Sequence, residues 1–377
     1  MNPLARLLAA PGDLLGIGLS GGTSADGIDA ALVRFRGGAA EPVAPELLAW
    51  RTEPLTTAER ELVFGLADAP PERLVRADLL LANRFADAAL AVLERCPTVI
   101  PDFAACGGQT VAHFGRRGTL QLGCPARLAL RLGIPVVARF RATDVAAGGE
   151  GAPLAPFLDW VLFRNAPGTI ALNLGGIANV TYVARDAAAC AAFDTGPANS
   201  LLDRCARWAS DGVRSYDEDG ALARAGRADE ALLAQLLAHP YFARPFPKST
   251  GLEDFGDPMF ADVRARAGDM SAPNLAATLV ELSARSVALG VRALAPRPCA
   301  RVVATGGGAR NPALMAALAR ALAPVPIAPY AADGWVDAKE AALFALLGHE
   351  TLRGRASSLP GATGTPTPRV LGGIYPA

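Results

Sequence analysis

The segment GIGLSGGTSADGIDAALVRF, residues 16–35, decides the fold. Two apolar runs, residues 14–19 and 28–35, flank a turn made of Ser, Gly, Thr and Asp. Apolar runs of this length bounded by glycine predict buried strands, so we expect a β-hairpin with a long polar tip. Glycines let such a tip approach a ligand closely, and its free N–H groups form an anion-binding nest. The candidate phosphate-binding residues are Ser20, Gly21, Gly22, Thr23, Ser24 and Asp26.

Two further interpretations of this segment remain open. A carboxylate beside the nest suits a phosphate that binds together with a divalent cation, which makes Asp26 a candidate metal ligand. The alternative is a hairpin tip without a binding function. Gly16, Gly18 and Gly21 also fit the dinucleotide pattern G-x-G-x-x-G. That pattern requires a helix directly after the glycines, where this sequence predicts a strand. A dinucleotide enzyme is therefore kept only as a competing hypothesis.

The composition limits the class of protein. A chain of 377 residues is expected to form two or three domains. The 36 basic and 36 acidic residues give a net charge of +0, so nothing favours binding to nucleic acid or an anionic membrane. The six cysteines form no C-x-x-C pair and are expected to be reduced. No apolar run reaches the ~18 residues of a membrane span, and we expect a cytoplasmic protein.

The second half of the chain repeats the pattern of strand, glycine turn and strand. It occurs in residues 169–183, and two more glycine turns follow, FDTGPANSLLD at residues 193–203 and TGGGARN at residues 305–311. The last of these leads into a predicted helix, and a helix N-terminus favours a nucleotide phosphate. The candidate nucleotide-binding residues are Asn173, Gly175, Gly176, Asn179, Gly306, Gly307, Gly308 and Asn311.

Other polar residues stand beside glycines. Asp144 precedes the cluster Gly148, Gly149 and Gly151, and it is either a general base or a residue that caps a turn or helix. Gln109 and Thr110 follow two glycines at a predicted strand end, where ligands collect in α/β sheets, although a plain turn is the alternative.

The four glycine turns in this order resemble those of the sugar kinase, heat-shock chaperone and actin superfamily. Within it, the chain is most similar to the anhydro-N-acetylmuramic acid kinase family, from about residue 16 to residue 377. The motifs that carry the resemblance are GLSGGTSADGID, GGEGAPLAP, NLGGIANVT, FDTGPAN, PKSTG, ATGGGARN, the helix with Glu340 and the terminal LGGIYPA.

The resemblance implies a kinase of bacterial cell-wall recycling. Such enzymes use ATP, Mg²⁺ and water to open the 1,6-anhydro bridge of 1,6-anhydro-N-acetylmuramic acid and to phosphorylate O6, giving N-acetylmuramic acid 6-phosphate and ADP. It implies that residues 20–26 hold the β- and γ-phosphates with Mg²⁺, that residues 173–179 form the second phosphate turn, and that residues 305–311 face the adenosine. Asp144 matches the base that activates water. The residues expected at the sugar are Gln109, Thr110, Arg141, Asp194 and Glu340.

The chain departs from the family pattern at three places. Gly107 stands where a His is usual, Arg139 where an Asp is usual, and Gly21 where a Ser is common. These changes motivate an alternative function, a non-catalytic relative that binds a nucleotide or sugar and senses cell-wall fragments.

The resemblance also implies an architecture. We expect an α/β fold of two actin-like ATPase lobes, each a mixed β-sheet flanked by helices, with a cleft between the lobes. The expected boundaries are residues 1–165 with about 350–377 for the N-terminal lobe and residues 166–349 for the C-terminal lobe. A homodimer is a possibility that the sequence leaves open.

Overall fold

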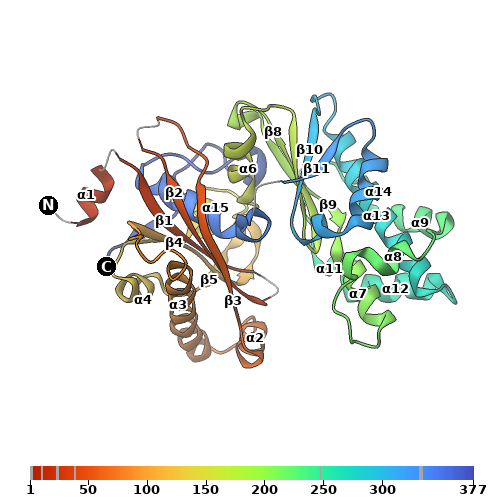
Figure 1. Cartoon of the computed structure of the whole chain (residues 1–377), viewed down its shortest axis with the longest axis horizontal. Helices are drawn as coiled ribbons and strands as arrows, with labels where there is room; N and C mark the ends of the chain where they lie inside the picture. Colours follow the sequence, from red (N-terminus) through yellow and green to blue (C-terminus); the bar gives the residue numbers. More distant parts are fainter. Residues whose placement is uncertain (1–2, 10–11, 23–24, 38–39, 247, 331–333) are drawn as a thin grey trace. The chain divides into compact units, whose positions relative to one another are not determined.

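The chain forms two compact units in a computed structural model, which describes all residues except 1–2, 10–11, 23–24, 38–39, 247 and 331–333 (Figure 1). The first unit comprises residues 1–162 and 337–377, and the second comprises residues 163–336. The chain thus re-enters the first unit at Asp337, whereas the sequence led us to expect the crossing near residue 350. Glu340 accordingly belongs to the first unit, because the helix that carries it packs on the sheet of that unit.

The first unit is built on a mixed sheet with the strand order β12-β6-β4-β1-β2-β3, and β5 pairs with β4. β1 runs antiparallel to β2 and parallel to β4, which confirms the predicted hairpin. A strand follows the glycines at positions 16, 18 and 21, so the helix that a dinucleotide motif requires is not there. The strands are β1 (Leu14–Gly21), β2 (Gly27–Phe35), β3 (Glu46–Pro54), β4 (Phe103–His113), β5 (Thr119–Leu122), β6 (Val136–Ala138) and β12 (Gly373–Tyr375).

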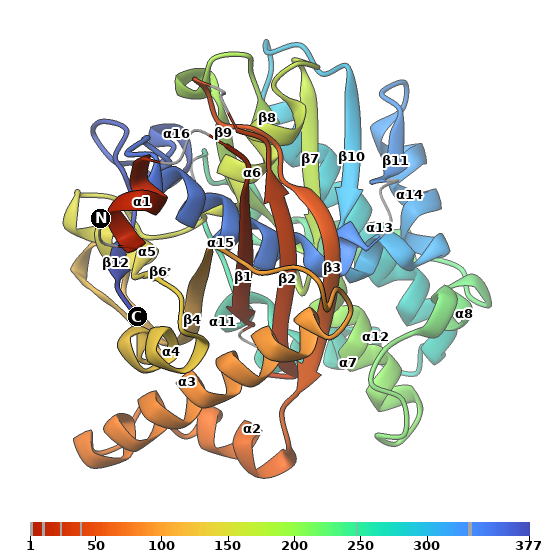
Figure 2. The ribbon, with the colours of Figure 1, turned by 60° about the vertical axis from the view of Figure 1, so that its left-hand side comes forward.

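Helices cover both faces of this sheet, and Figure 2 shows α3 and α15 on opposite sides of it. On one face Ile17 and Leu19 of β1 share a hydrophobic core with Phe85 of α3. On the other face a side chain at Gly18 would overlap the Ala341 carbonyl of α15, so glycine permits the close packing of this helix. The helices are α1 (Pro3–Ala9), α2 (Thr57–Phe64), α3 (Pro71–Leu93), η1 (Gly115–Arg117), α4 (Pro125–Leu132), α5 (Phe140–Ala146), α6 (Ala155–Phe163), α15 (Trp335–Leu352) and α16 (Pro360–Thr363).

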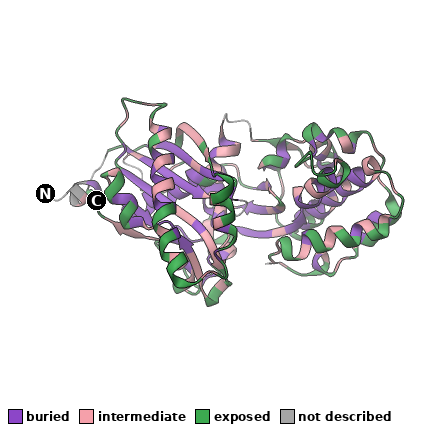
Figure 3. Cartoon of the chain, turned by 90° about the horizontal axis from the view of Figure 1, so that it is seen from below, coloured by how far each residue is buried: buried purple, intermediate pink, exposed green. Residues whose placement is uncertain are grey.

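The second unit is built on a five-stranded sheet with the order β11-β10-β7-β8-β9. Its strands are β7 (Thr169–Leu174), β8 (Ile177–Val183), β9 (Ala191–Pro197), β10 (Arg301–Thr305) and β11 (Ile327–Pro329). Its helices are η2 (Ala187–Ala189), α7 (Asn199–Ala209), η3 (Glu218–Gly220), α8 (Ala221–Arg224), α9 (Glu230–Leu237), α10 (Pro240–Ala243), α11 (Leu252–Phe255), α12 (Asp257–Ala267), α13 (Ala272–Ala293), η4 (Gly307–Arg310) and α14 (Pro312–Leu322). Figure 3 shows that buried residues follow the strands and the inner helix faces.

The two sheets repeat one topology. In the first unit β1, β2 and β3 form an antiparallel meander, and β4 and β6 join it in parallel. In the second unit β7, β8 and β9 form the same meander, and β10 and β11 join it in the same way. The duplication that the glycine turns predict is therefore present in the strand pairing, so the tip of β1–β2 corresponds to the tip of β7–β8.

No helix among the described residues is both long enough and apolar enough to cross a membrane.

Candidate active site

Ser20 lies near the end of β1 and opposes Asp29 of β2, which in turn opposes Thr52 of β3. The Ser20 side chain is 1% exposed, and its Oγ has no hydrogen-bond partner among the described residues. Thr52 donates a hydrogen bond from its hydroxyl to Asp29 at 2.6 Å. A buried hydroxyl without a partner is costly, so Ser20 is prepared to bind a polar ligand.

Asp29 was not among the residues expected from the sequence. Its pKa is raised to about 6, mainly by burial; the hydrogen bond from Thr52 opposes the rise, and the charges of Glu340 and Asp337 add to it. A carboxylate whose pKa is raised by burial and like charges favours a cation beside it. The alternation of side chains along β2 could have indicated this residue. Side chains of a strand alternate between the two faces of the sheet, so the residue that opposes Ser20, Asp29, lies on the same face as Ser20.

The tip of this hairpin is described only in part, because Thr23 and Ser24 lie outside the described residues. The Gly22 carbonyl accepts a hydrogen bond from Gln109 Nε2 at 3.1 Å. The Asp26 side chain is 66% exposed and forms an ion pair with Arg60 at 2.9 Å. Asp26 thus already has a cationic partner, whereas Asp29 is turned to the same face of the sheet as Ser20.

Gln109 and Thr110 lie inside β4, which continues to His113, and not in a turn. Gln109 is 1% exposed and pairs with Gly21, and its Oε1 has no hydrogen-bond partner among the described residues. A Cβ added at Gly21 would lie 2.6 Å from this Oε1, so glycine at position 21 makes room for the Gln109 amide. Thr110 accepts a weaker hydrogen bond from Gln121 at 3.4 Å.

An aromatic ring lies beside Gly107, the position where the family usually has a histidine. A Cβ added at Gly107 would overlap the ring of Phe344 on α15. Phe344 is 2% exposed and contacts the Phe140 ring, with 5.7 Å between the ring centroids. An aromatic ring therefore fills the space beside Gly107, and the departure from the family pattern leaves no void there.

Asp144 lies on α5 and is fully buried, at 0% exposure. Its Oδ2 accepts a hydrogen bond from the Gly151 N–H at 2.8 Å, and its Oδ1 accepts one from the Thr363 hydroxyl at 2.9 Å. Burial raises its pKa, and these two hydrogen bonds and Arg141 oppose the rise. The side chain thus holds the glycine turn, and its role as a general base, for which a raised pKa is favourable, stays a prediction.

Arg141 lies beside this carboxylate and is also influenced by Glu340. The Arg141 guanidinium donates to the Gly151 carbonyl at 3.1 Å. Burial lowers the pKa of Arg141, while the charges of Glu340 and Asp144 raise it. Glu340 itself is exposed on the first turns of α15. The same glutamate acts on Arg141 and on Asp29, so α5, β2 and α15 form one electrostatic group in the first unit.

His113 and Thr363 also belong to this site, although the sequence did not indicate them. The Nδ1 of His113 lies 3.0 Å from the Thr119 hydroxyl, and a Cβ at Gly151 would lie 3.2 Å from its Cε1. Burial and the charge of Arg141 lower the pKa of His113, which keeps the ring neutral at pH 7. His113 therefore packs against the glycine that donates to Asp144.

Four polar residues form a row across the second sheet. The strand register places Thr305 beside Asn173, Asn173 beside Asn179, and Asn179 beside Asp194. This row is the counterpart of Thr52, Asp29 and Ser20, because the two meanders share one topology. Predicted residues from three separate segments are thus brought together at the ends of neighbouring strands.

The glycine turns of this unit pack against one another. A Cβ at Gly306, where φ is +82°, would lie 2.8 Å from Asn173 Oδ1. The Asn199 side chain donates to the carbonyls of Leu174 and Gly175 at 3.0 Å and 2.9 Å. The Ser200 N–H donates to the Gly176 carbonyl at 3.0 Å. The start of α7 therefore fixes the carbonyls of residues 174–176.

A cavity of about 510 Å³ opens beside these turns. Gly307 and Asn311 are the expected nucleotide-binding residues that line it. A Cβ at Gly307 would meet nothing within 4 Å, so the backbone faces open space there. Asn311 also caps α14, because its Oδ1 accepts hydrogen bonds from two N–H groups of the first turn, at 3.0 Å and 3.2 Å. The other lining residues are Asn199, Leu202, Asp203, Tyr216, Asp217, Glu218, Asp219 and Arg310.

Asp194 holds the loop of residues 248–251, which precedes α11. Its carboxylate accepts a hydrogen bond from the Thr250 N–H at 3.0 Å, and its own N–H donates to the Lys248 carbonyl at 3.0 Å. Burial raises the pKa of Asp194 to about 6, and hydrogen bonds from Thr250 and Ser249 oppose that rise. The residue expected at the sugar thus has a structural function, which is to attach this loop to β9.

Within the described residues there is no group of three or more His, Cys, Asp or Glu that could hold a metal ion.

Comparison with known proteins gives a consistent result. The family model described as anhydro-N-acetylmuramic acid kinase matches residues 14–377. A protein of that name from Streptomyces coelicolor is 42% identical over 372 residues, covering 96% of this chain and 93% of its own length. Proteins of the same name from Bordetella avium and Xanthomonas oryzae pv. oryzae are each 43% identical, and the matches cover 96% and 97% of this chain and 96% and 98% of theirs.

Proposed function

We propose that this chain, which belongs to the anhydro-N-acetylmuramic acid kinase family, carries out the reaction of that family. It uses ATP and water to open the 1,6-anhydro ring of 1,6-anhydro-N-acetylmuramic acid and phosphorylates O6, giving N-acetylmuramic acid 6-phosphate and ADP. The observation that supports the proposal for the site is the burial of Asp144 and its raised pKa, since this is the residue that the sequence resemblance matches to the base of the family. The reaction consumes ATP, which favours the cytoplasm as its compartment.

Asp144 would act as the base that takes a proton from water. The water oxygen attacks C1, the bond from C1 to O6 breaks, and the electron pair stays on O6. O6 then forms the bond to the γ-phosphorus as ADP leaves. This is an inverting glycoside cleavage in which the phosphoryl group takes the place of the usual acid, so a single carboxylate is enough.

The first hairpin fits a phosphate group with its magnesium ion. Ser20 offers a buried hydroxyl without a described partner, and Asp29 offers a carboxylate on the same face. Mg²⁺ binds oxygen ligands and typically uses one or two carboxylates together with substrate phosphates. We infer that Ser20 and Asp29 would hold the ion, with Asp26 as the earlier candidate that Arg60 already neutralises. Such an ion would neutralise charge on the phosphates.

The second unit would bind the adenosine. Its 510 Å³ cavity has the size of a small-molecule site, roughly 300–1,000 Å³. Carboxylates such as Asp203 and Asp217 accept hydrogen bonds from ribose hydroxyls, and the backbone at Gly307 lets a ligand approach. Asn173 and Asn179 would position the phosphates together with the turn of residues 175–176, because they oppose each other on the two strands that this turn joins.

Sugar recognition would rest on the first unit. The Oε1 of Gln109 lacks a partner among the described residues, and a sugar hydroxyl would supply the missing donor. Arg141 offers a cation for the lactyl carboxylate, while Thr110 and Glu340 offer further hydrogen-bonding groups. Asp194 would act indirectly, through the loop that it anchors.

A product assay tests the proposal. The purified chain is incubated with ATP, Mg²⁺ and the anhydro-sugar in ¹⁸O-labelled water, and the products are analysed by mass spectrometry. We expect ADP and a 6-phosphosugar that carries one ¹⁸O at C1. A 6-phosphosugar without the label would contradict the hydrolytic step. Binding of both ligands without any product would instead favour the non-catalytic alternative.

A further inference from the structure

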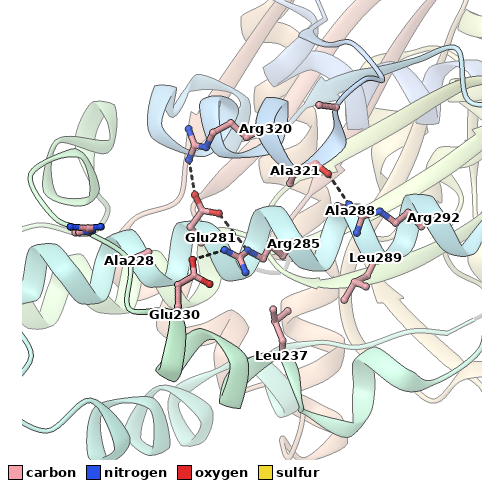
Figure 4. A pocket seen from close by; sticks show the side chains of 12 residues that line it. Ala228, Glu230, Leu237, Glu281, Arg285, Ala288, Leu289, Arg292, Arg320 and Ala321 are labelled. Carbon is pink, nitrogen blue, oxygen red and sulfur yellow. Dashed lines mark hydrogen bonds and ion pairs between the residues drawn. The ribbon is translucent and has the colours of Figure 1, made fainter.

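A second hollow lies in the helical layer of the second unit, away from the 510 Å³ cavity, and Figure 4 shows it from close by. Its volume is about 690 Å³, and α13 forms its floor between α9 and α14. Four arginines and two glutamates line it, which leaves an excess of two positive charges in a chain whose net charge is +0. These residues are Arg227, Arg285, Arg292, Arg320, Glu230 and Glu281. The hollow shares no lining residue with the 510 Å³ cavity.

Two guanidinium groups converge on one carboxylate in this hollow. Arg320 lies 2.6 Å from one oxygen of Glu281, and Arg285 lies 3.7 Å from the other. Arg285 also contacts Glu230 at 2.6 Å. Figure 4 shows that these four side chains come from three helices and form one connected group. Glu281 and Glu230 together balance the two cations of this group, so the excess positive charge of the hollow comes from Arg227 and Arg292.

The outer carboxylate is the replaceable one. The Glu230 side chain is 68% exposed, whereas that of Glu281 is 19% exposed. An exposed ion pair contributes little because water and salt screen it. A ligand with more charge than one carboxylate can therefore take the place of Glu230 at Arg285 while Glu281 keeps the two arginines together.

Arginine indicates the chemistry of the ligand. Its planar fork matches the oxygens of a phosphate group in a bidentate manner, and such hydrogen bonds are among the strong ones. The adjoining hollow adds Arg224 and shares Arg227 and Arg320, so the positive surface continues beyond the first hollow. We propose that this hollow is a second anion site, which binds a small molecule with two or more negative charges on phosphate.

Calorimetric titration of the full chain tests the site. The probes are sodium pyrophosphate, which stands for the diphosphate of a nucleotide, and glucose 6-phosphate, which stands for a sugar phosphate. The probe that binds more tightly identifies the source of the phosphate. We expect saturable binding that weakens with added salt. The double variant Arg285→Gln/Arg320→Gln should lose at least about tenfold in affinity, since it removes charge-assisted hydrogen bonds.

Two further variants make the test sharper. Glu230→Gln removes the competing carboxylate, so it should tighten binding by roughly threefold. Glu230→Gln breaks the same ion pair as Arg285→Gln. A loss of binding caused by misfolding would therefore appear in both variants, whereas a loss of the anion site should appear only in the arginine variant. Arg266→Gln is the matched control, because Arg266 pairs with Asp262 on α12 outside the hollow. Equal affinity in the double variant and the unsubstituted chain, or no saturable binding of either probe, would overturn the proposal.

Discussion

The carboxylate of Asp144 accepts a hydrogen bond from the hydroxyl of Thr363 at 2.9 Å, across 219 positions of the chain. The Thr363 carbonyl in turn accepts a hydrogen bond from the Glu150 N–H at 2.7 Å. The C-terminal segment is thus joined both to the proposed base on α5 and to the glycine turn that follows it. This contact fixes the carboxylate oxygen that is not bound to Gly151, and it explains why a terminal segment contributes to the site.

Replacing the base tests its function directly. Asp144→Asn should retain binding of ADP, because the nucleotide cavity lies in the second unit, and should lower kcat by about 10²–10⁴-fold. Rates of ADP release and a titration with ADP measure the two effects. Asp262→Asn on the surface of α12 is the matched control and should leave both unchanged. Normal turnover in Asp144→Asn would remove this residue from the mechanism.

The hydrogen bond from Thr363 should tune the pKa of the base. This bond lowers the pKa of Asp144 against the effect of burial, so Thr363→Val should raise it. The base is active only when ionised, and the acidic limb of the pH–rate profile should therefore move to higher pH. Thr363→Ser keeps a hydroxyl and should restore the original limb. An unchanged profile in Thr363→Val would show that the contact only supports the fold.

Asp29 should affect both magnesium dependence and stability. Asp29→Asn should raise the Mg²⁺ concentration needed for half-maximal rate by about tenfold, more than Asp26→Asn does.

The pKa of Asp29 in the folded chain is about 6, above its ordinary value of 3.8, so the unfolded chain loses this proton first as pH rises. Stability is therefore lost between about pH 4 and pH 6, and Asp29→Asn should raise the melting temperature at pH 7. Equal magnesium dependence in the Asp26 and Asp29 variants would contradict the assignment.

A buried ion group should make the first unit sensitive to acid. Glu350 is 0% exposed and accepts hydrogen bonds from Arg355 at 2.6 Å and 2.7 Å, and His349 lies 2.8 Å away. Burial would raise the pKa of Glu350, but these hydrogen bonds outweigh it and lower the pKa, while burial lowers the pKa of His349.

Both shifts have the same consequence for stability. The unfolded chain takes up a proton on His349 first as pH falls below its ordinary value of 6.5, and on Glu350 as pH falls below 4.5. Urea unfolding should therefore give a lower free energy of unfolding at pH 5 than at pH 7. Glu350→Gln should cost about 3–5 kcal/mol at pH 7, because it leaves Arg355 without its carboxylate. A variant of unchanged stability would show that the group contributes nothing.

The sequence predicts those elements whose structure depends on neighbouring residues. The hairpin of β1 and β2 follows from its two apolar runs and its glycines, and the strand pairing confirms its repetition in β7 and β8. The sequence was insufficient where distant segments meet. Asp29 gains its importance from register with Ser20, and Thr363 and His113 gain theirs from packing around Gly151. The glycines before Gln109 were interpreted as the end of a strand, but β4 continues through them with an irregular register.

The contact between Gly18 and the backbone of α15 has one further consequence. A methyl group at position 18 would act like a wedge under the helix, since the Ala341 carbonyl could not stay where it is. Displacement of the helix would move Glu340, the residue before Ala341, away from the sheet. Its repulsion of Asp29 and its attraction to Arg141 would then both become weaker. Gly18 therefore affects the position of Glu340 relative to the charges of Asp29 and Arg141, although all three lie on other elements of the unit.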